Sequence, residues 1–232
     1  MIYLISDIHG EYELFLSLLE KINFSNNDKM FVLGDMIDKG KYSIKLLQFL
    51  QKQLNITCIM GNHEYDLIKI YHAIMRESPT DFNAVLKTLQ AYFPFDGELL
   101  NWETVDWLES LPFYVETPSF IGVHAGVPLN SDNTLTCLSK VLPEQFVYDR
   151  DFKSPTTLPK TEKCVFFGHT PTCFINGKSE IVAYKHPHGG GEGVNAFCKV
   201  NLDTGVWING VLGCFCVDNC KAYYISKKNC NN

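Results

Sequence analysis

Five short polar clusters, each placed directly after an apolar run, are the feature that most constrains the fold of this chain. The clusters occupy residues 7–10, 34–40, 61–64, 124–126 and 168–170. Short apolar runs that end in Gly, Asp, Asn and His residues are typical of buried strands followed by loops. Each motif alone is a weak signal, but the five in this order indicate a sheet that gathers polar side chains along one edge.

The first 60 residues alternate between strand-like and helix-like patterns. Apolar runs at 2–6, 30–33 and 56–60 predict strands, and helical periodicity at 14–22 and 44–50 predicts the helices between them. This order is βαβαβ, which implies parallel pairing with right-handed crossovers. Because the carboxyl ends of parallel strands share one edge of a sheet, we expect the first three clusters to meet there.

The segment after the third cluster has a helical pattern. Helices are expected over 65–77, 82–93 and 99–111, with breaks at prolines. We interpret them as a helical cap at about 65–113 that covers the sheet or shapes access to a site. No repeat or composition shift divides the chain, so a single domain over residues 1–232 is expected.

Later strands are expected at 120–123 and 165–167, and each ends at a histidine. From residue 194 onward, alternating short runs such as 197–200 and 223–225 predict an antiparallel finish. The glycine-rich stretch 189–193 is predicted to be a loop without the pattern of a phosphate-cradling motif.

Charge and cysteine usage narrow the function classes. The net charge is −6, which argues against general nucleic-acid binding. No apolar run reaches transmembrane length, and the first apolar run is interpreted as a strand and not as a signal peptide, so we expect a cytoplasmic protein without membrane association. Nine cysteines without a Cys-x-x-Cys pair are interpreted as reduced thiols, with a soft-metal or disulfide site at the C-terminal cysteines as the alternative.

The clusters supply donors that suit two divalent cations. Six residues are candidate metal ligands: Asp7, His9, Asp35, Asn62, His124 and His169. Carboxylate and amide oxygens together with imidazoles suit Mn²⁺, with Fe or Zn²⁺ as alternatives. Asp35 could bridge the two ions through its two oxygens. Such a pair of metals would clamp a phosphoryl group and acidify a water molecule for in-line attack on phosphorus.

Four further residues are candidates for proton transfer and phosphate binding. His63 follows the ligand candidate Asn62 and could protonate a leaving oxygen, with Asp38 holding its imidazolium. Arg150 and Lys39 could bind the remaining phosphate oxygens. Any one of these residues could instead be a turn, a helix cap or a surface cation, but their joint order favours a catalytic site.

These motifs resemble the calcineurin-like metallophosphoesterases, and among them the phosphoprotein phosphatases in their compact bacterial and phage form. That family reads Asp-x-His-Gly, Gly-Asp-x-x-Asp-Arg-Gly, Gly-Asn-His-Glu, His-Ala and Gly-His-Thr, and this chain matches across residues 1 to about 170. The Asp-Thr-Gly turn at 203–205 also matches. The resemblance implies an α/β fold, a four-layer αββα sandwich of two mixed sheets flanked by helices. It further implies Asp7, His9 and Asp35 on one metal, and Asp35, Asn62, His124 and His169 on the other.

Two residues depart from the family pattern. The family's Asp-Arg-Gly reads Asp-Lys-Gly here, so Lys39 lacks the planar fork of arginine. Tyr148 replaces the tryptophan that precedes the second arginine of the family, which corresponds to Arg150.

The resemblance favours a metal-dependent phosphoprotein phosphatase acting on phosphorylated Ser, Thr or Tyr residues of a protein or peptide. The same motifs also serve diadenosine-polyphosphate hydrolases, whose substrate is a dinucleoside polyphosphate. A non-catalytic metal-binding scaffold is the third possibility, and the intact pair of His63 and Asp38 argues against it.

Overall fold

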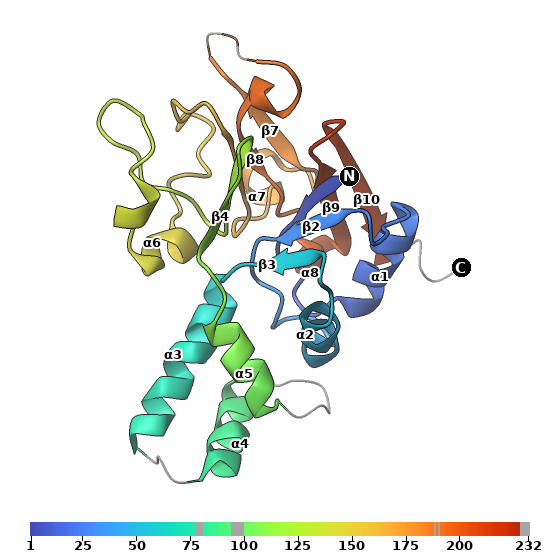
Figure 1. Ribbon diagram of the computed structural model, residues 1–232, viewed down its shortest axis with the longest axis vertical. Helices are drawn as coiled ribbons and strands as arrows, with labels where there is room; N and C mark the ends of the chain where they lie inside the picture. Colours follow the sequence, from blue (N-terminus) through green and yellow to red (C-terminus); the bar gives the residue numbers. More distant parts are fainter. Residues whose placement is uncertain (78–80, 94–99, 188, 190, 228–232) are drawn as a thin grey trace.

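The computed structural model describes residues 1–77, 81–93, 100–187, 189 and 191–227, and its strands form two five-stranded sheets (Figure 1). The first sheet has the order β10–β9–β1–β2–β3. Its strands are β1 (Ile2–Ile5), β2 (Lys29–Val32), β3 (Ile56–Cys58), β9 (Val211–Cys216) and β10 (Lys221–Ser226). As predicted, β1, β2 and β3 pair in parallel, and β9 with β10 form the antiparallel finish.

The second sheet has the order β4–β5–β6–β8–β7. Its strands are β4 (Tyr114–Glu116), β5 (Phe120–Val123), β6 (Cys164–Phe167), β7 (Val182–Lys185) and β8 (Phe197–Asn201). Strand β8 runs parallel to β6, so the antiparallel prediction from residue 194 onward is wrong for this strand pair. The reason is a long excursion through β7, which pairs with the outer edge of β8. Both sheets are therefore mixed.

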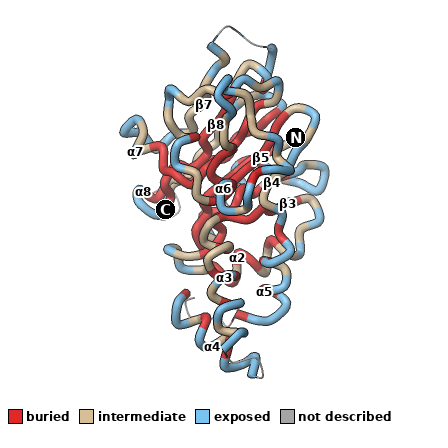
Figure 2. Tube along the Cα trace, turned by 90° about the vertical axis from the view of Figure 1, so that its left-hand side faces the viewer, coloured by how far each residue is buried: buried red, intermediate tan, exposed pale blue. Residues whose placement is uncertain are grey.

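The core follows from the alternation of side chains along the strands. Leu4, Phe120, Phe166 and Phe215 come from both sheets and form one buried cluster between them. Residues one position away, such as Ile5, point to the opposite face of the sheet and belong to the second cluster. Figure 2 shows that buried residues concentrate in the sheets.

Helices cover the outer surfaces. Helices α1 (Tyr12–Lys21) and α2 (Ser43–Gln51) join the parallel strands, and the buried face of α1 lies against β9 and β10. Five short elements complete the fold: η1 (Leu138–Lys140), α6 (Pro143–Tyr148), α7 (Cys173–Asn176), η2 (Gly193–Ala196) and α8 (Val206–Asn209). Two mixed sheets flanked by helices confirm the predicted fold class.

Three helices protrude from the sheets as an extension (Figure 1). They are α3 (Asn62–Glu77), α4 (Phe82–Tyr92) and α5 (Trp102–Glu109). Helix α3 begins at Asn62 and not at residue 65, which places the third polar cluster in its first turn. The start of the helix predicted at 99 lies outside the described residues. The cap role and the single-domain assignment stay predictions. In the described ranges, no helix combines the length and apolarity that crossing a membrane requires.

Candidate metal centre

The loops after β1 and β2 bring carboxylates and an imidazole to one point. The Nε2 atom of His9 lies 3.7 Å from Oδ2 of Asp35 and 4.0 Å from Oδ1 of Asp7. All three side chains are 98% buried or nearly so. Burial removes water from these polar atoms, so a cation is the natural partner for them.

The second sheet supplies two histidines that face the same carboxylate from the other side. Nε2 of His124, at the end of β5, lies 3.3 Å from Oδ1 of Asp35. Oδ1 of Asn62 lies 3.0 Å from that Nε2 atom and 2.8 Å from Nδ1 of His169, which follows β6. The predicted ligand set therefore converges, with Asp35 in the middle.

Backbone carbonyls fix the orientation of two of these imidazoles. Nδ1 of His9 lies 3.0 Å from the carbonyl oxygen of Ile37, and Nδ1 of His124 lies 2.8 Å from that of Leu33. A carbonyl only accepts hydrogen bonds, so each Nδ1 atom carries a proton and donates it. With Nδ1 protonated, the position left for a metal ion is Nε2, which points into the pocket, as in metal-binding histidines.

The donor set fits a pair of cations by a further test. Buried Nε2 of His169 has no hydrogen-bond partner among the described residues. Burial lowers the pKa of His9 to about 4 and that of His169 to about 2, so both rings are neutral near pH 7. Burial raises the pKa of Asp35 well above its usual value, a cost that a bound cation would offset. Two sets of three side chains have donor atoms close enough together to hold a metal ion, and Asp35 belongs to both. One set is His9, Asp35 and His63, and the other is Asp35, His124 and His169.

One carboxylate in the third cluster has a supporting role that sequence reasoning did not assign. Glu64 is completely buried in the first turn of α3. It accepts hydrogen bonds from the backbone N–H groups of Asp35, Met36, Ile37 and Gly61, at 2.8–3.0 Å. These bonds hold the loop after β2 against α3 and so position Asp35. The signal was its place beside Asn62 and His63, in a run that follows a strand.

The pocket is held in a costly backbone conformation. Six residues in the loops that form the pocket and its margin have a positive φ between 48° and 69°: Asp7, His9, Asp35, Asp38, Lys39 and His169. Each such residue costs on the order of 1–3 kcal/mol, and strain of this kind concentrates at functional sites. Local propensity opposes this geometry, so the rest of the fold must impose it.

Glycine is required where the loops approach the carboxylates. A Cβ atom on Gly168 would lie 2.1 Å from Oδ2 of Asp7, and one on Gly61 would lie 2.4 Å from Oδ1 of Asp35. The loops can approach so closely because these residues lack side chains.

His63 and Asp38 form the pair that the sequence predicted. Nδ1 of His63 lies 2.8 Å from Oδ2 of Asp38, which turns Nε2 toward Asp35 at 3.8 Å. Burial opposes the charged form of His63, but the hydrogen bond to Asp38 and the charge of Asp35 outweigh it and raise the pKa. The bond to His63 lowers the pKa of Asp38 to about 2. The arrangement favours a protonated imidazole at the pocket wall.

Arg150 and Lys39 lie near different donors of the pocket, Arg150 near His169 and Lys39 near His9. Arg150 follows α6, and its positive charge contributes to the low pKa of His169, after burial and His124. Lys39 directly follows Asp38, and its Nζ atom lies 4.4 Å from the centre of the Trp207 ring. We call these three residues, Arg150, Lys39 and Trp207, the rim of the pocket.

A buried lysine fixes the segment that carries Arg150. Lys199 of β8 is fully buried, and its Nζ atom donates to the carbonyl oxygens of Phe152 at 2.5 Å and Ser154 at 2.8 Å. Burial lowers the pKa of Lys199 to about 8. The sequence did not predict this role for Lys199, because buried and solvent-facing lysines in a strand can have the same apolar neighbours in the sequence.

The Asp-Thr-Gly turn also reaches the pocket. Asp203 is buried, and its Oδ1 atom accepts from the N–H of Gly205 at 2.8 Å. Burial and the nearby charge of Asp7 raise the pKa of Asp203 well above its usual value.

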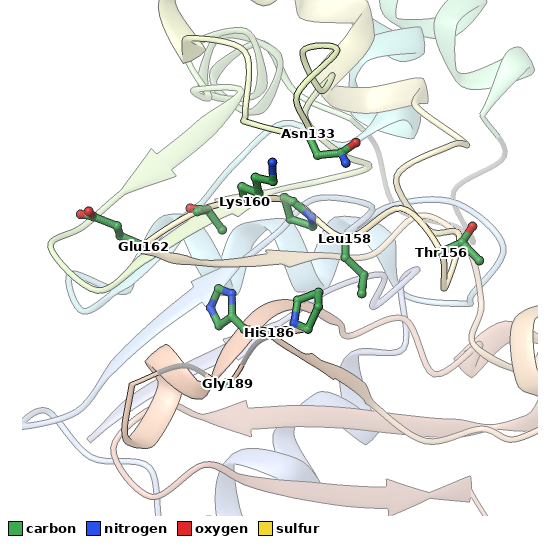
Figure 3. Close-up of a pocket in the computed structure, with 10 residues that line it drawn as sticks. Asn133, Thr156, Leu158, Lys160, Glu162, His186 and Gly189 are labelled. Atoms are coloured by element: carbon green, nitrogen blue, oxygen red, sulfur yellow. The ribbon is translucent and has the colours of Figure 1, made fainter.

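A cavity of about 650 Å³ lies elsewhere, between residues 156–162 and the segment after β7 (Figure 3). Its lining includes Asn133, Lys160 and His186, and none of the five polar clusters contributes to it. Cavity size therefore does not mark the chemical centre of this molecule.

Comparison with known proteins agrees with this geometry. The family model of the calcineurin-like phosphoesterases matches residues 1–210. The bis(5'-nucleosyl)-tetraphosphatase (symmetrical) of Cellvibrio japonicus is 32% identical over 156 residues, which cover 66% of this chain and 54% of that protein. The enzyme of the same name from Haemophilus ducreyi is 33% identical over 141 residues, which cover 58% and 49%.

Among solved structures, a putative diadenosine tetraphosphatase has the same fold. It superposes with a TM-score of 0.69 at 17% identity and covers 97% of this chain and 92% of that one. The chain spans about half the length of the curated relatives it matches.

The chain belongs to the calcineurin-like phosphoesterase family. The prediction of a phosphoprotein phosphatase is wrong, because the curated relatives are named for tetraphosphate-bridged dinucleosides and not for phosphoproteins. The pocket motifs are shared by both kinds of enzyme, so they could not distinguish a phosphoester from a phosphoanhydride. The roles of the individual site residues stay predictions.

Proposed function

We propose that this protein hydrolyses dinucleoside polyphosphates, with diadenosine tetraphosphate as the representative substrate. The observation that carries the proposal is the convergence of Asp35, His124 and the other donors on one pocket, together with the substrate named for the curated relatives. Cleavage at the central phosphoanhydride would release two nucleoside diphosphates.

The proposal includes two divalent cations in the pocket. Asp7, His9 and Asp35 would hold one, and Asp35, Asn62, His124 and His169 the other. We expect Mn²⁺, with Fe or Zn²⁺ as alternatives, because the donors mix imidazoles with hard oxygens. When bound, such a pair polarises phosphoryl oxygens and acidifies a water molecule.

The remaining chemistry is assigned to side chains of this chain. His63 would hold a proton on Nε2, the nitrogen that faces Asp35 across 3.8 Å, and deliver it to the leaving oxygen. Asp38 would keep that ring charged and oriented through its 2.8 Å bond to Nδ1. Arg150 and Lys39 would bind phosphate oxygens outside the pocket.

The direct test is product analysis. Purified protein with Mn²⁺ is incubated with diadenosine tetraphosphate, and the nucleotides are separated by ion-exchange chromatography. ADP as the sole nucleotide product supports the proposal, and equal amounts of AMP and ATP would indicate cleavage at an outer bond. An intact dinucleotide under conditions that hydrolyse an aryl phosphate would refute it. Asp35→Asn protein is the control for a contaminating hydrolase.

A further inference from the structure

One residue of the rim, Trp207, has a large apolar side chain that has no role in the chemistry proposed above. Trp207 lies on α8, and 44% of its surface is exposed, although tryptophan side chains are highly buried on average. Ile208 beside it is 42% exposed. An indole held in this way on a short, well-anchored element is a preformed flat surface.

The anchoring of α8 places this surface at the pocket. The preceding turn contains Asp203, which is buried. Its burial and the nearby charges of Asp7 and Asp35 raise its pKa. Gly205, with φ at 73°, ends the turn and directly precedes α8, whose first residue, Val206, is buried. Two residues beyond Gly205, the chain presents Trp207 on its exposed side.

Lys39 connects the indole to the proton-transfer pair. Its Nζ atom lies 4.4 Å from the centre of the Trp207 ring, and its backbone N–H donates to Oδ1 of Asp38 at 2.8 Å. The other oxygen of Asp38 holds His63. From the rim into the pocket, the order is therefore the indole of Trp207, the ammonium of Lys39 and the proposed acid His63.

We propose that Trp207 and Lys39 form a subsite for a nucleoside phosphate. In this subsite a nucleobase stacks on the indole, and the lysine ammonium binds a phosphate between that base and the bond to be cleaved. The inference rests on the proposed function, which makes a nucleotide the occupant. Every base has a flat π-face, so stacking tolerates different bases, while the ammonium complements the charge of the polyphosphate.

The chemistry of Lys39 suits this arrangement. A lysine ammonium on a flexible stem can turn from the ring to a phosphate. The family's arginine would keep its planar guanidinium stacked on the indole more firmly. Lysine at position 39 therefore suits a cation that moves from the ring to a bound phosphate.

The test compares a nucleotide with its base-free counterpart. Inhibition constants of ADP and of pyrophosphate are measured against aryl-phosphate hydrolysis at fixed Mn²⁺ and pH. Trp207→Leu should raise the inhibition constant of ADP by about 5- to 100-fold, the range that one stacked base contributes. The inhibition constant of pyrophosphate should stay unchanged. Trp207→Phe should retain most of the ADP affinity. Lys39→Ala should weaken both inhibitors.

Trp102→Leu is the matched control, because Trp102 is 39% exposed on α5 of the protruding helices. It should change neither constant. Equal weakening of ADP and pyrophosphate in Trp207→Leu would overturn the proposal, since Trp207 would then act only through Lys39. Unchanged ADP affinity would overturn it as well.

A second readout does not depend on turnover. ADP should quench tryptophan fluorescence in the wild type, and the quenching should disappear in Trp207→Phe. Persistent quenching in that variant would contradict stacking. Failure of the proposed function would look different: diadenosine tetraphosphate stays intact in the wild type, while the difference between ADP and pyrophosphate persists.

Discussion

The pocket and its rim are built in opposite ways. Most of the proposed donors of the pocket are buried and have a positive φ, and backbone N–H groups of the loop that carries Asp35 donate to Glu64. The rim residues Trp207 and Lys39 are at least partly exposed and touch each other, and Arg150 is exposed. A rigid interior suits chemistry that tolerates little displacement, whereas an open margin suits the recognition of a variable ligand.

This contrast also explains why related pockets serve different substrates. In the proposed function the interior would act on a phosphorus atom and its oxygens, which are alike in phosphoesters and phosphoanhydrides. The parts of a substrate outside its reacting phosphate would contact only the rim. Changes in the pocket should therefore abolish activity on every substrate, and changes at the rim should alter affinity in a substrate-dependent way.

Removing the shared carboxylate should have the largest effect. Asp35→Ala should lose bound metal and lower kcat for aryl phosphate by more than the roughly 10²–10³-fold cost of removing one electrostatic stabilising group. The measurement is elemental analysis alongside kinetics. Asp132→Ala, at an exposed loop carboxylate, is the control. Full metal content in Asp35→Ala would contradict its central place in the pocket.

The next largest effect should come from His63. His63→Gln should retain metal and lower kcat by roughly 10²–10⁴-fold for phenyl phosphate, whose leaving oxygen needs a proton. The loss should shrink for nitrophenyl phosphate, a better leaving group. His63 also lies within reach of the donors His9 and Asp35. Loss of metal in this variant, or equal losses on both substrates, would identify His63 as a ligand and not as the acid.

At the rim, Arg150→Ala should raise KM and leave kcat nearly intact. A charge-assisted pair with a phosphate would account for roughly 10- to 100-fold in affinity. Arg76→Ala, at the far end of α3, removes a guanidinium at a distance from the pocket and should change nothing. A fall in kcat without a change in KM would place Arg150 among the pocket residues instead.

The smallest effect concerns the anchor of the rim. Burial lowers the pKa of Lys199 to about 8 from 10.5, so the unfolded chain binds more protons between these two values. The free energy of unfolding should therefore rise with pH from 8 to 10.5, by at most about 1.4 kcal/mol per pH unit. Lys199→Met should lack this rise, and Lys178→Met, at an exposed lysine, should keep it. Urea titrations at pH 7.5 and 9.5 measure the difference.

The sequence predicted the interior better than the margin. Short apolar runs that end in Asp, Asn or His predicted the strands. Because strand ends share an edge, they also predicted that Asp35, Asn62 and His124 lie close together, as the structure shows. The missed residues, Glu64, Lys199 and Trp207, act through tertiary neighbours. Glu64 lies in a recognised polar cluster, but its bonds form only when the loop after β2 folds onto it. Hydrophobic periodicity likewise does not show that Trp207 lies beside a lysine from another loop.

Helix α3 joins the two regions mechanically. Its first turn holds Asn62 and His63. Further along the helix, Tyr65 donates to Glu144 and Lys69 donates to Tyr148 of α6, next to the segment that carries Arg150. The whole helix is 16 residues long, about 24 Å, and its later turns belong to the protruding extension. The other end of α3 packs against α4 and α5, so the three helices form a lever on these contacts. A tilt of the extension should therefore move the donor atoms of the interior and the segment that carries Arg150 together.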